Sequence, residues 1–219
     1  MSDEASETNG QSLVRQAYAR IEEMIITLAL EPGAIVTEAR IAEAVGMDRT
    51  PVREALQQLV REGLVEVLPK RGIRISRIDA AKQLRMLEFR RQVERFIARS
   101  AALNATEAAR QAFAGYAAQF RQIEGNGDNA AFIGVDDAFT AAMADCSRNE
   151  YASEALKLTH GLSRRFANAY AFEVHGLRDN AARHAALATA ISEGNAERAV
   201  EKIDALIDGV VAFTRSKLP

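Results

Sequence analysis

Three polar side chains near position 50 are spaced so that they could read nucleic acid together: Arg49, Arg53 and Gln57. Residues four apart lie on one face of a helix, and arginine and glutamine can fork onto base edges or phosphates. Thr50 adds a hydroxyl to the same face. Between Arg49 and Arg77 seven basic residues stand against three glutamates, although the whole chain carries a net charge of -2. This basic cluster is typical of a phosphate-contacting surface, but it also fits a solvated face that binds nothing.

Three helices must position this face. Apolar residues recur at helical spacing over Leu13–Leu28, which predicts a first helix with one buried stripe. The hydroxyl of Thr37 is expected to cap a second helix, and Asp48 is expected to cap a third helix that ends at Gly63. In the third helix Pro51 falls in the first turn, where its missing N–H costs nothing, and the face opposite the polar one is apolar.

A β-hairpin is expected to follow the third helix, because apolar residues then alternate with a period of two. The alternating positions are Val65 and Val67, and then Ile73 and Ile75. Between them Pro69-Lys70-Arg71-Gly72 forms a turn, so Lys70 and Arg71 give the hairpin a basic tip. Ile35 and Val36 indicate another short extended piece.

This order of elements is the plan of a winged helix-turn-helix, in which the third helix enters the major groove and the hairpin reaches the backbone or the minor groove. The alternative is a small helical domain with a hairpin that binds no DNA. Basic residues concentrate both on the outer face of the third helix and at the hairpin tip, and this coincidence favours DNA binding.

The run MDRTPVREALQQLVREGLVEVLPKRGIRIS resembles the DNA-binding signature of GntR-family transcription regulators, and the resemblance covers residues 11–78. The motif RTPVREAL, followed by EGLV and a P-x-R-G turn, carries most of it. The resemblance implies that Arg49, Thr50 and Arg53 contact DNA from the third helix. It also implies that Gly72 lets the hairpin approach the DNA backbone closely.

From residue 79 onward the pattern is helical and contains no strand signals. Six helices are expected, over residues 80–103, 106–124, 129–146, 149–172, 177–192 and 196–216. The fold class is therefore mainly α, with a winged helix-turn-helix of three helices and a β-hairpin over residues 11–78. An all-α bundle of six to seven helices follows over residues 79–219. Residues 1–10 are acidic and polar and are expected to form a disordered tail.

Three stretches of the helical region, LEFRRQVE, VDDAFTAAMADCSRNE and HAALATAISEGNAERA, are similar in order and spacing to the FadR-type branch of that family. The resemblance implies an FCD domain that binds an effector and dimerises, with a pocket that often holds a metal. At the ligand positions Asp136 and His184 remain, whereas Thr140 and Leu206 stand where the family has histidines. We therefore expect no metal cofactor, because a strong site needs three or four convergent ligands. Asp136 and His184 are weak residual candidates, and His184 alone fits a pocket or core histidine.

Arg90 lies on the first helix of this region and could fork onto a carboxylate effector. The alternative is an intrahelical pair with Glu94, which stands four residues on. The candidate effector pocket thus consists of Arg90, Asp136, Thr140, His184 and Leu206. Three other arginines are expected to be solvated, namely Arg164, Arg165 and Arg183. Five phenylalanines are expected in the core, namely Phe113, Phe120, Phe132, Phe139 and Phe166.

Composition excludes several classes of protein. The one cysteine, Cys146, excludes an internal disulfide and any multi-cysteine metal site, and the three histidines limit histidine-based catalysis. No stretch approaches the roughly 20 apolar residues of a membrane span. The first ten residues lack the basic start and apolar core of a secretory signal, so we expect a cytoplasmic protein. A glycine-rich phosphate loop, a G-x-S-x-G elbow and a Glu-x-x-His pair are all absent, which argues against an enzyme.

The leading hypothesis is a ligand-responsive bacterial transcription regulator. A homodimer would present two recognition helices to a palindromic operator in double-stranded DNA, and a small organic acid in the helical domain would change operator affinity. Repression is the mode that the resemblance favours. Two alternatives stay open: a constitutive DNA-binding protein whose helical domain only dimerises, and an enzyme with an accessory DNA-binding head.

Overall fold

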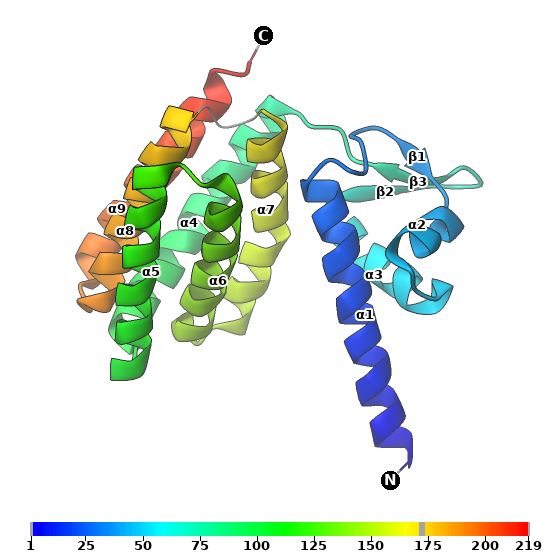
Figure 1. Cartoon of the computed structure of the whole chain (residues 1–219), viewed down its shortest axis with the longest axis horizontal. Coiled ribbons are helices and arrows are strands. Elements are labelled where there is room, and N and C mark those ends of the chain that lie inside the picture. Colours follow the sequence, from blue (N-terminus) through cyan, green and yellow to red (C-terminus); the bar gives the residue numbers. More distant parts are fainter. Residues whose placement is uncertain (1, 171–173, 219) are drawn as a thin grey trace. The chain divides into compact units, whose positions relative to one another are not determined.

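The computed structural model describes residues 2–170 and 174–218, and the chain divides into two compact units. The first unit comprises Met1–Asp79 together with Leu158–Tyr170, and the second comprises Ala80–Lys157 together with Ala171–Pro219. Figure 1 labels the helices and strands of both. Among the helices described, none combines the length and the apolar character needed to cross a membrane.

The N-terminal part of the first unit contains three helices and a small sheet. In chain order its elements are α1 (Ser2–Ile26), β1 (Ile35–Val36), α2 (Glu38–Val45), α3 (Arg49–Arg61), β2 (Val65–Leu68) and β3 (Gly72–Ile75). The sheet is antiparallel with the order β1-β3-β2. The expected helices and hairpin are confirmed, and the short piece at Ile35 and Val36 is also a strand, because it pairs with Arg74 and Ile73 of β3.

Helix α1 starts earlier than the sequence suggested. It begins at Ser2, so residues 2–10, expected as a disordered tail, are its first turns. Nucleation is the costly step of helix formation, and each added residue then costs little. The stretch contains no proline to stop a helix that the buried stripe of Ala17, Ile21 and Ile25 already fixes.

The caps of α2 and α3 differ in a way that the sequence explains. The Thr37 hydroxyl accepts a hydrogen bond from the Arg40 backbone N–H at 3.2 Å, as expected. Asp48 is the N-cap residue of α3, but its side chain makes no capping bond. A capping side chain bonds the N–H of the second or third helical residue. The third residue here is Pro51, which has no N–H, so one of the two possible donors is missing.

The second unit is helical throughout its described part. Its elements are α4 (Ala80–Asn104), α5 (Glu107–Asn126), α6 (Asn129–Ser147), α7 (Glu150–Ala169), α8 (Val174–Ser192) and α9 (Ala196–Arg215). All six expected helices are present, although the expected end of the fourth at Phe172 lies outside the described residues. The last part of α7, from Leu158 onward, groups with the first unit together with Tyr170, the residue that follows the helix.

Aromatic side chains fill the core of the helical unit, as expected. Four phenylalanines are buried there, namely Phe113, Phe120, Phe132 and Phe139. The ring of Phe139 meets the rings of Phe113 and Phe120 edge-on, with ring centroids 5.9 and 5.5 Å apart. Aromatic pairs prefer this geometry. Phe166 is also buried, but it belongs to the first unit and packs on Tyr170 at 4.7 Å.

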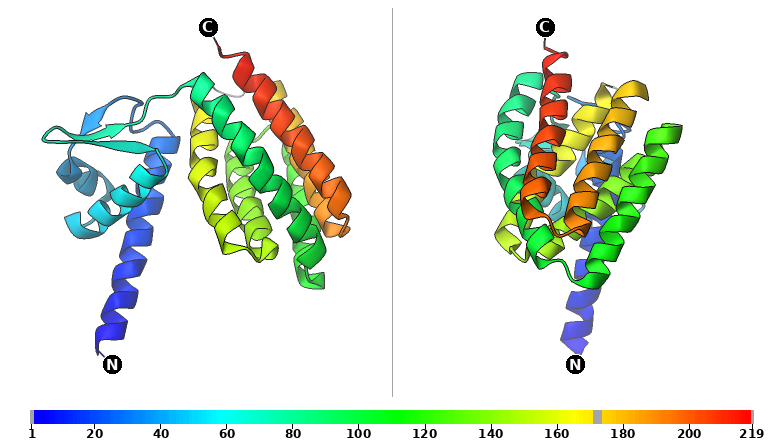
Figure 2. Two further views of the ribbon diagram at one scale, coloured as in Figure 1. Left: turned by 180° about the vertical axis from the view of Figure 1, so that it is seen from behind. Right: turned by 90° about the vertical axis from the view of Figure 1, so that its left-hand side faces the viewer.

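An ion-pair network joins α4 to α9, which lie side by side in Figure 2. Arg95 forks onto the Asp204 carboxylate at 2.8 and 2.7 Å, and Arg91 bonds Asp204 at 3.1 Å and Asp208 at 2.5 Å. Partial burial raises the pKa of Asp204, but the hydrogen bonds from Arg95 and Arg91 outweigh it and hold the pKa below its usual range. The network therefore stabilises the folded state wherever Asp204 is ionised.

We expect Asp204→Asn to destabilise the helical unit by about 1–2 kcal/mol at pH 7, because the pair is only partly buried. A carboxyl with a lowered folded pKa contributes stability above its unfolded pKa of about 3.9 and loses it as the pH falls through the folded value. Urea unfolding of both proteins at pH 7 and pH 3 checks this, and the difference should shrink in acid. Asp208→Asn, which removes one exposed contact, is the matched control. An equal deficit at both pH values would contradict the assignment.

Candidate nucleic-acid interface and buried polar site

A polar cluster fixes α3 on α1 within the first unit. The Tyr18 hydroxyl donates to Glu62 Oε2 at 2.7 Å, and the Gln58 side-chain amide donates to Glu62 Oε1 at 3.0 Å. Burial raises the pKa of Tyr18, and the neighbouring carboxylates of Glu22 and Glu62 raise it further. The hydroxyl therefore remains a donor, and the end of α3 is held by directional bonds as well as by its apolar face.

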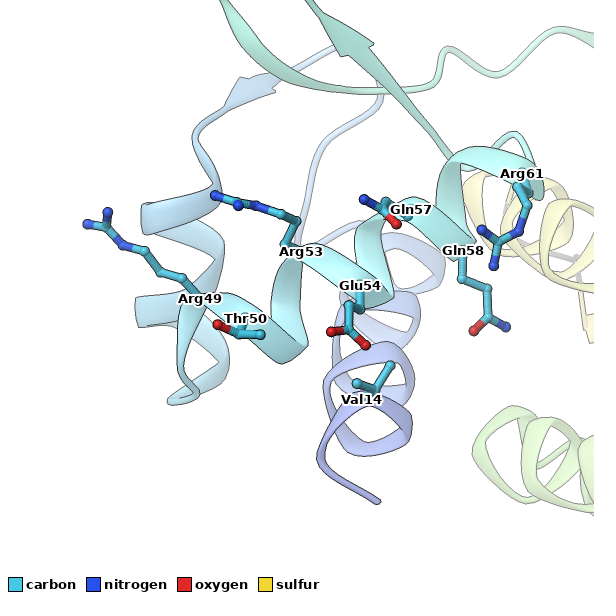
Figure 3. A pocket seen from close by; sticks show the side chains of 8 residues that line it. All are labelled: Val14, Arg49, Thr50, Arg53, Glu54, Gln57, Gln58 and Arg61. Carbon is cyan, nitrogen blue, oxygen red and sulfur yellow. The ribbon is translucent and has the colours of Figure 1, made fainter. Parts of the chain in front are cut away.

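The outer face of α3 carries the side chains that the sequence singled out. Figure 3 shows the guanidinium groups of Arg49 and Arg53 extending to the same side of the helix, with Gln57 farther along it. All three are exposed, as is Thr50. Together they line one concave surface, whose residues are Val14, Arg49, Thr50, Arg53, Glu54, Gln57, Gln58 and Arg61. The structure thus brings the expected recognition residues together on one side of the unit.

Arg53 has a partner that the sequence did not indicate. Its Nε donates to Glu38 Oε2 at 3.2 Å, while its side chain remains 63% exposed. Glu38 stands in the first turn of α2, fifteen residues away in sequence. The pair is too exposed to contribute much stability. Its effect is to orient the guanidinium and to place a negative charge beside it.

The hairpin tip is a tight turn with an unusual residue in it. The Arg71 N–H donates to the Leu68 carbonyl at 2.9 Å, which closes a four-residue turn over Pro69 and Lys70. Lys70 occupies the third position with φ = 61°. Proline in the second position fits type I and type II turns, and the type II turn needs a positive φ at the third position, where glycine is preferred. A lysine there costs about 1–2 kcal/mol, so the exposed cation is held at the tip against a backbone preference.

Gly72 is needed by the fold itself. Its φ is 107°, and a Cβ on it would lie 2.6 Å from the Val36 carbonyl oxygen. That approach is the pairing of β3 with β1. The family resemblance implied that position 72 is a glycine because the hairpin approaches DNA closely. The structure gives a separate reason for a glycine there, the close contact with Val36 within the chain. Lys70, Arg71 and Gly72 all lie at the hairpin tip, away from the concave surface on α3.

Arg90 is buried and paired. Its Nε and Nη2 both lie 2.7 Å from Glu94 Oε1, one turn along α4, which confirms the intrahelical alternative. Both side chains are nearly inaccessible, with relative exposures of 8% and 2%. The other oxygen of Glu94, Oε2, has no hydrogen-bond partner among the described residues. Burying a carboxylate with one oxygen unsatisfied costs free energy. The ion pair therefore offsets only part of the cost of burying these two charges in α4.

His184 and Asp136 meet directly in the helical unit. His184 Nδ1 lies 2.8 Å from the Asn180 carbonyl and Nε2 lies 3.1 Å from Asp136 Oδ1. A carbonyl oxygen only accepts, so Nδ1 carries a proton. Nε2 is therefore the ring nitrogen that faces the Asp136 carboxylate. The imidazole sits among the rings of Phe120 and Phe132, at 5.0 and 5.2 Å.

The two positions where the family has histidines differ in burial. Thr140 stands one turn after Asp136 on α6 and is partly exposed. Leu206 is buried in the apolar cluster that also contains Phe120, Phe132 and Phe139. The backbone carbonyl of Asn180, one turn before His184 on α8, is a part of the site that sequence reasoning missed, and any residue at that position would supply it, so the sequence carried no signal for it.

The expectation that Arg165 is solvated is wrong. Its exposure is 2%, its Nη2 donates to the Ser76 carbonyl, and its Nε has no partner among the described residues. Burial lowers the pKa of Arg165 to about 10. The reason is that Leu158–Tyr170 packs into the first unit, so a face of α7 that periodicity alone leaves outward is covered. Arg164 and Arg183 are partly buried.

Comparison with known proteins yields matches over both units. Residues 13–75 match the family described as bacterial regulatory proteins, gntR family, and residues 85–209 match the FCD domain. An uncharacterized HTH-type transcriptional regulator of Streptomyces ambofaciens is 46% identical over 77 residues, which are 35% of this chain and 33% of that protein. The HTH-type transcriptional repressor RspR of Escherichia coli K12 is 34% identical over 98 residues, 44% of this chain and 42% of that protein.

The matches to curated relatives span between about a quarter and two fifths of the relatives' own length. Solved structures extend the likeness to nearly the whole chain. E. coli McbR/YncC superposes with a TM-score of 0.79 at 21% identity, covering 94% of this chain and 98% of that one. A GntR transcriptional regulator from Rhodococcus sp. RHA1 superposes with a TM-score of 0.69 at 21% identity, covering 95% and 100%. At such identity the likeness concerns the fold.

Proposed function

Because the chain belongs to the GntR family of bacterial regulatory proteins and carries an FCD domain, we propose that it is a dimeric, ligand-responsive repressor of transcription. Like its relatives, it is a transcription regulator and not an enzyme. The proposal adds a homodimer, a palindromic operator in double-stranded DNA, a small-molecule effector and a cytoplasmic location. Repression is favoured by the likeness to the repressor RspR.

The observation that carries the proposal is the outer face of α3. Arg49, Arg53 and Gln57 are exposed on one side of a helix whose opposite side is buried. Such side chains can bond base edges when the helix lies in the major groove. The exposed cations at the hairpin tip, Lys70 and Arg71, are available for phosphates. Two such heads related by a two-fold axis would read two half-sites.

The effector is proposed to bind in the helical unit near its buried charges. An organic acid could take the place of Glu94 on the Arg90 fork, because a carboxylate ligand offers the same bidentate geometry. The Glu94 carboxylate would then need a new donor, so an acid that also carries a hydroxyl or an ammonium group would satisfy both side chains. Asp136, Thr140, His184 and Leu206 complete the proposed pocket.

We propose that this pocket works without a metal. Asp136 and His184 already contact each other in the geometry described above, and Thr140 and Leu206 supply no imidazole. We expect protein purified without chelator to carry far less than one transition metal per subunit by elemental analysis. EDTA should leave its melting temperature unchanged. About one tightly bound metal per subunit, lost in an Asp136→Asn variant, would refute this proposal.

The test of the proposed function is selection of DNA from a random pool, followed by footprinting of the selected sequence. We expect two inverted half-sites about one helical turn apart. A screen of small hydroxy acids and amino acids for thermal stabilisation should then identify compounds that weaken operator binding. A stable operator complex with no responsive compound would favour the constitutive alternative. No sequence preference in the selected pool would refute the proposal.

Lys70 allows the hairpin contact to be tested without disturbing the fold. We expect Lys70→Gly to change stability by less than about 1 kcal/mol, because relief of the positive φ offsets the added freedom of the unfolded chain. DNA binding should weaken about equally for operator and random DNA, and the slope of log K against log salt should fall by about 0.9. Lys157→Ala, which removes a lysine from α7, should change neither. An unchanged salt slope in Lys70→Gly would contradict the contact.

A further inference from the structure

Asp48 places a negative charge at the start of the helix that carries the recognition side chains. It directly precedes Arg49 and Thr50, which Figure 3 shows on the first turn of α3. Its side chain is exposed, like the three arginines that α3 contributes to the concave surface, Arg49, Arg53 and Arg61. A carboxylate at this position repels DNA phosphates and so weakens the attraction that the arginines supply.

Neither helix capping nor ion pairing explains this charge. The Asp48 side chain makes no capping hydrogen bond with α3, and it forms no hydrogen bond or ion pair with any other described residue. The helix dipole favours a negative charge at this end, but a neutral serine or asparagine caps a helix about as well as aspartate does. The stability of α3 therefore does not require a carboxylate here.

The place of Asp48 in the head suits it to contact bases. Its backbone is extended, with φ = -66° and ψ = 156°, and the helix begins with the next residue. Asp48 therefore stands at the leading end of α3. In a helix-turn-helix the N-terminal residues of the recognition helix are the ones that contact base edges, so a side chain at this end lies within reach of the major groove.

A carboxylate discriminates between the bases of the major groove because it can only accept hydrogen bonds. Cytosine presents its N4 amino group, which is a donor, whereas guanine and thymine present acceptors and no donor. Adenine presents a donor beside its N7 acceptor, so a carboxylate fits it less well. Opposite any base other than cytosine the carboxylate would lose water without a full replacement, which disfavours binding to that site.

We propose that Asp48 is a specificity-determining residue that selects a cytosine in each operator half-site by accepting a hydrogen bond from the N4 amino group. This inference rests on the proposed function, in which α3 lies in the major groove. Repulsion between Asp48 and phosphates lowers the affinity for all DNA, and the bond to cytosine restores affinity at the operator alone. The residue thus raises the ratio of operator binding to random binding, the quantity that governs occupancy in a genome.

The test is selection of DNA from a random pool by the wild type and by Asp48→Ser, which keeps a capping residue but removes the charge. The wild-type motif should contain a cytosine in each half-site whose replacement lowers affinity by about 5- to 100-fold. In Asp48→Ser this position should lose its base preference while the other positions keep theirs, and affinity for random DNA should rise. Titration of four operators that differ only at this position measures the effect.

Glu43→Gln is the matched control. Glu43 is an exposed carboxylate on α2 that lines the same hollow as Asp48, so its replacement makes an equal change in charge close by. Affinity for random DNA should rise in this variant too, but the preference for cytosine should persist. The comparison therefore separates the reading of a base from the removal of a charge.

Asp48→Asn, which keeps the shape of the side chain, provides a second variant in case Asp48→Ser fails to fold. Its amide both donates and accepts, so it should prefer adenine at the same position. Loss of the cytosine preference in either folded variant, with Glu43→Gln unchanged, supports the inference. A folded Asp48 variant that selects the wild-type motif overturns it, as does an equal loss of the preference in Glu43→Gln. These results are distinct from failure of the proposed function, which would appear as wild-type protein that selects no DNA sequence.

Discussion

Replacing Arg90 by alanine is expected to destabilise the helical unit by about 3–5 kcal/mol, because it leaves a buried charge without its partner. Glu94 is 2% exposed, and its Oε2 already lacks a hydrogen bond among the described residues. Arg90 provides both of the short contacts to Oε1. Without the guanidinium the carboxylate must either take up a proton or draw water into the unit, and both cost free energy.

Matched variants separate the charge effect from lost packing. Glu94→Gln should cost less than Arg90→Ala, because Arg90 stays charged but its long side chain can reach toward solvent. The double variant Arg90→Met with Glu94→Leu should recover most of the lost stability, since apolar residues of similar volume often replace a buried pair without loss. Urea unfolding of the three proteins checks this order. Equal stability of Arg90→Ala and wild type would show that the pair is not buried in solution.

The same pair sets the expected response to an effector. If an acid competes with Glu94 for the Arg90 fork, Glu94→Gln should bind that acid more tightly, because the internal competitor has lost its charge. Arg90→Ala should lose the thermal stabilisation by the acid while retaining operator affinity. The comparison must use ligand-induced shifts in melting temperature within each variant, since the variants start from different stabilities.

Local sequence patterns were sufficient to predict most of the fold. Helical periodicity and the signals that start or end an element act over a few residues. The cap at Thr37, the stop at Gly63 and the Pro69–Gly72 turn therefore allowed α2, α3 and the hairpin to be predicted directly. The extended piece at Ile35 and Val36 was indicated, but its pairing was not, because its partners in β3 lie almost forty positions away. The missing side-chain capping bond at Asp48 was readable in principle, since Pro51 lacks one of the two N–H groups that a capping side chain can bond.

The contacts that the sequence could not supply join elements far apart in the chain. Glu38 meets Arg53 only because α2 and α3 pack at a particular angle. Arg165 is buried only because part of α7 packs into the first unit. The spacing of apolar residues in α7 does not predict this packing. By contrast, Arg90 and Glu94 are one helical turn apart, and spacing alone therefore made that pair a candidate.

Arg53→Ala is expected to weaken binding to the selected operator by about 1–3 kcal/mol, the cost of losing a bidentate base contact. Binding to random DNA should change much less, because non-specific affinity comes mainly from phosphate contacts. Titrations of both DNAs at one fixed salt concentration measure the two losses. Equal losses on operator and random DNA would assign Arg53 to a phosphate, and no loss on either would remove α3 from the interface.

Glu38 gives this experiment an internal control. In the free protein its carboxylate holds the Arg53 guanidinium at 3.2 Å, so DNA must either displace Glu38 or use the arginine in the orientation that Glu38 imposes. If Glu38 competes with DNA, Glu38→Gln should raise affinity for operator and random DNA alike, since it removes a negative charge near phosphates. If Glu38 positions Arg53, the variant should lose discrimination between operator and random DNA while gaining non-specific affinity. In the Arg53→Ala background the discrimination effect of Glu38→Gln should vanish, because Glu38 can act on base reading only through that arginine.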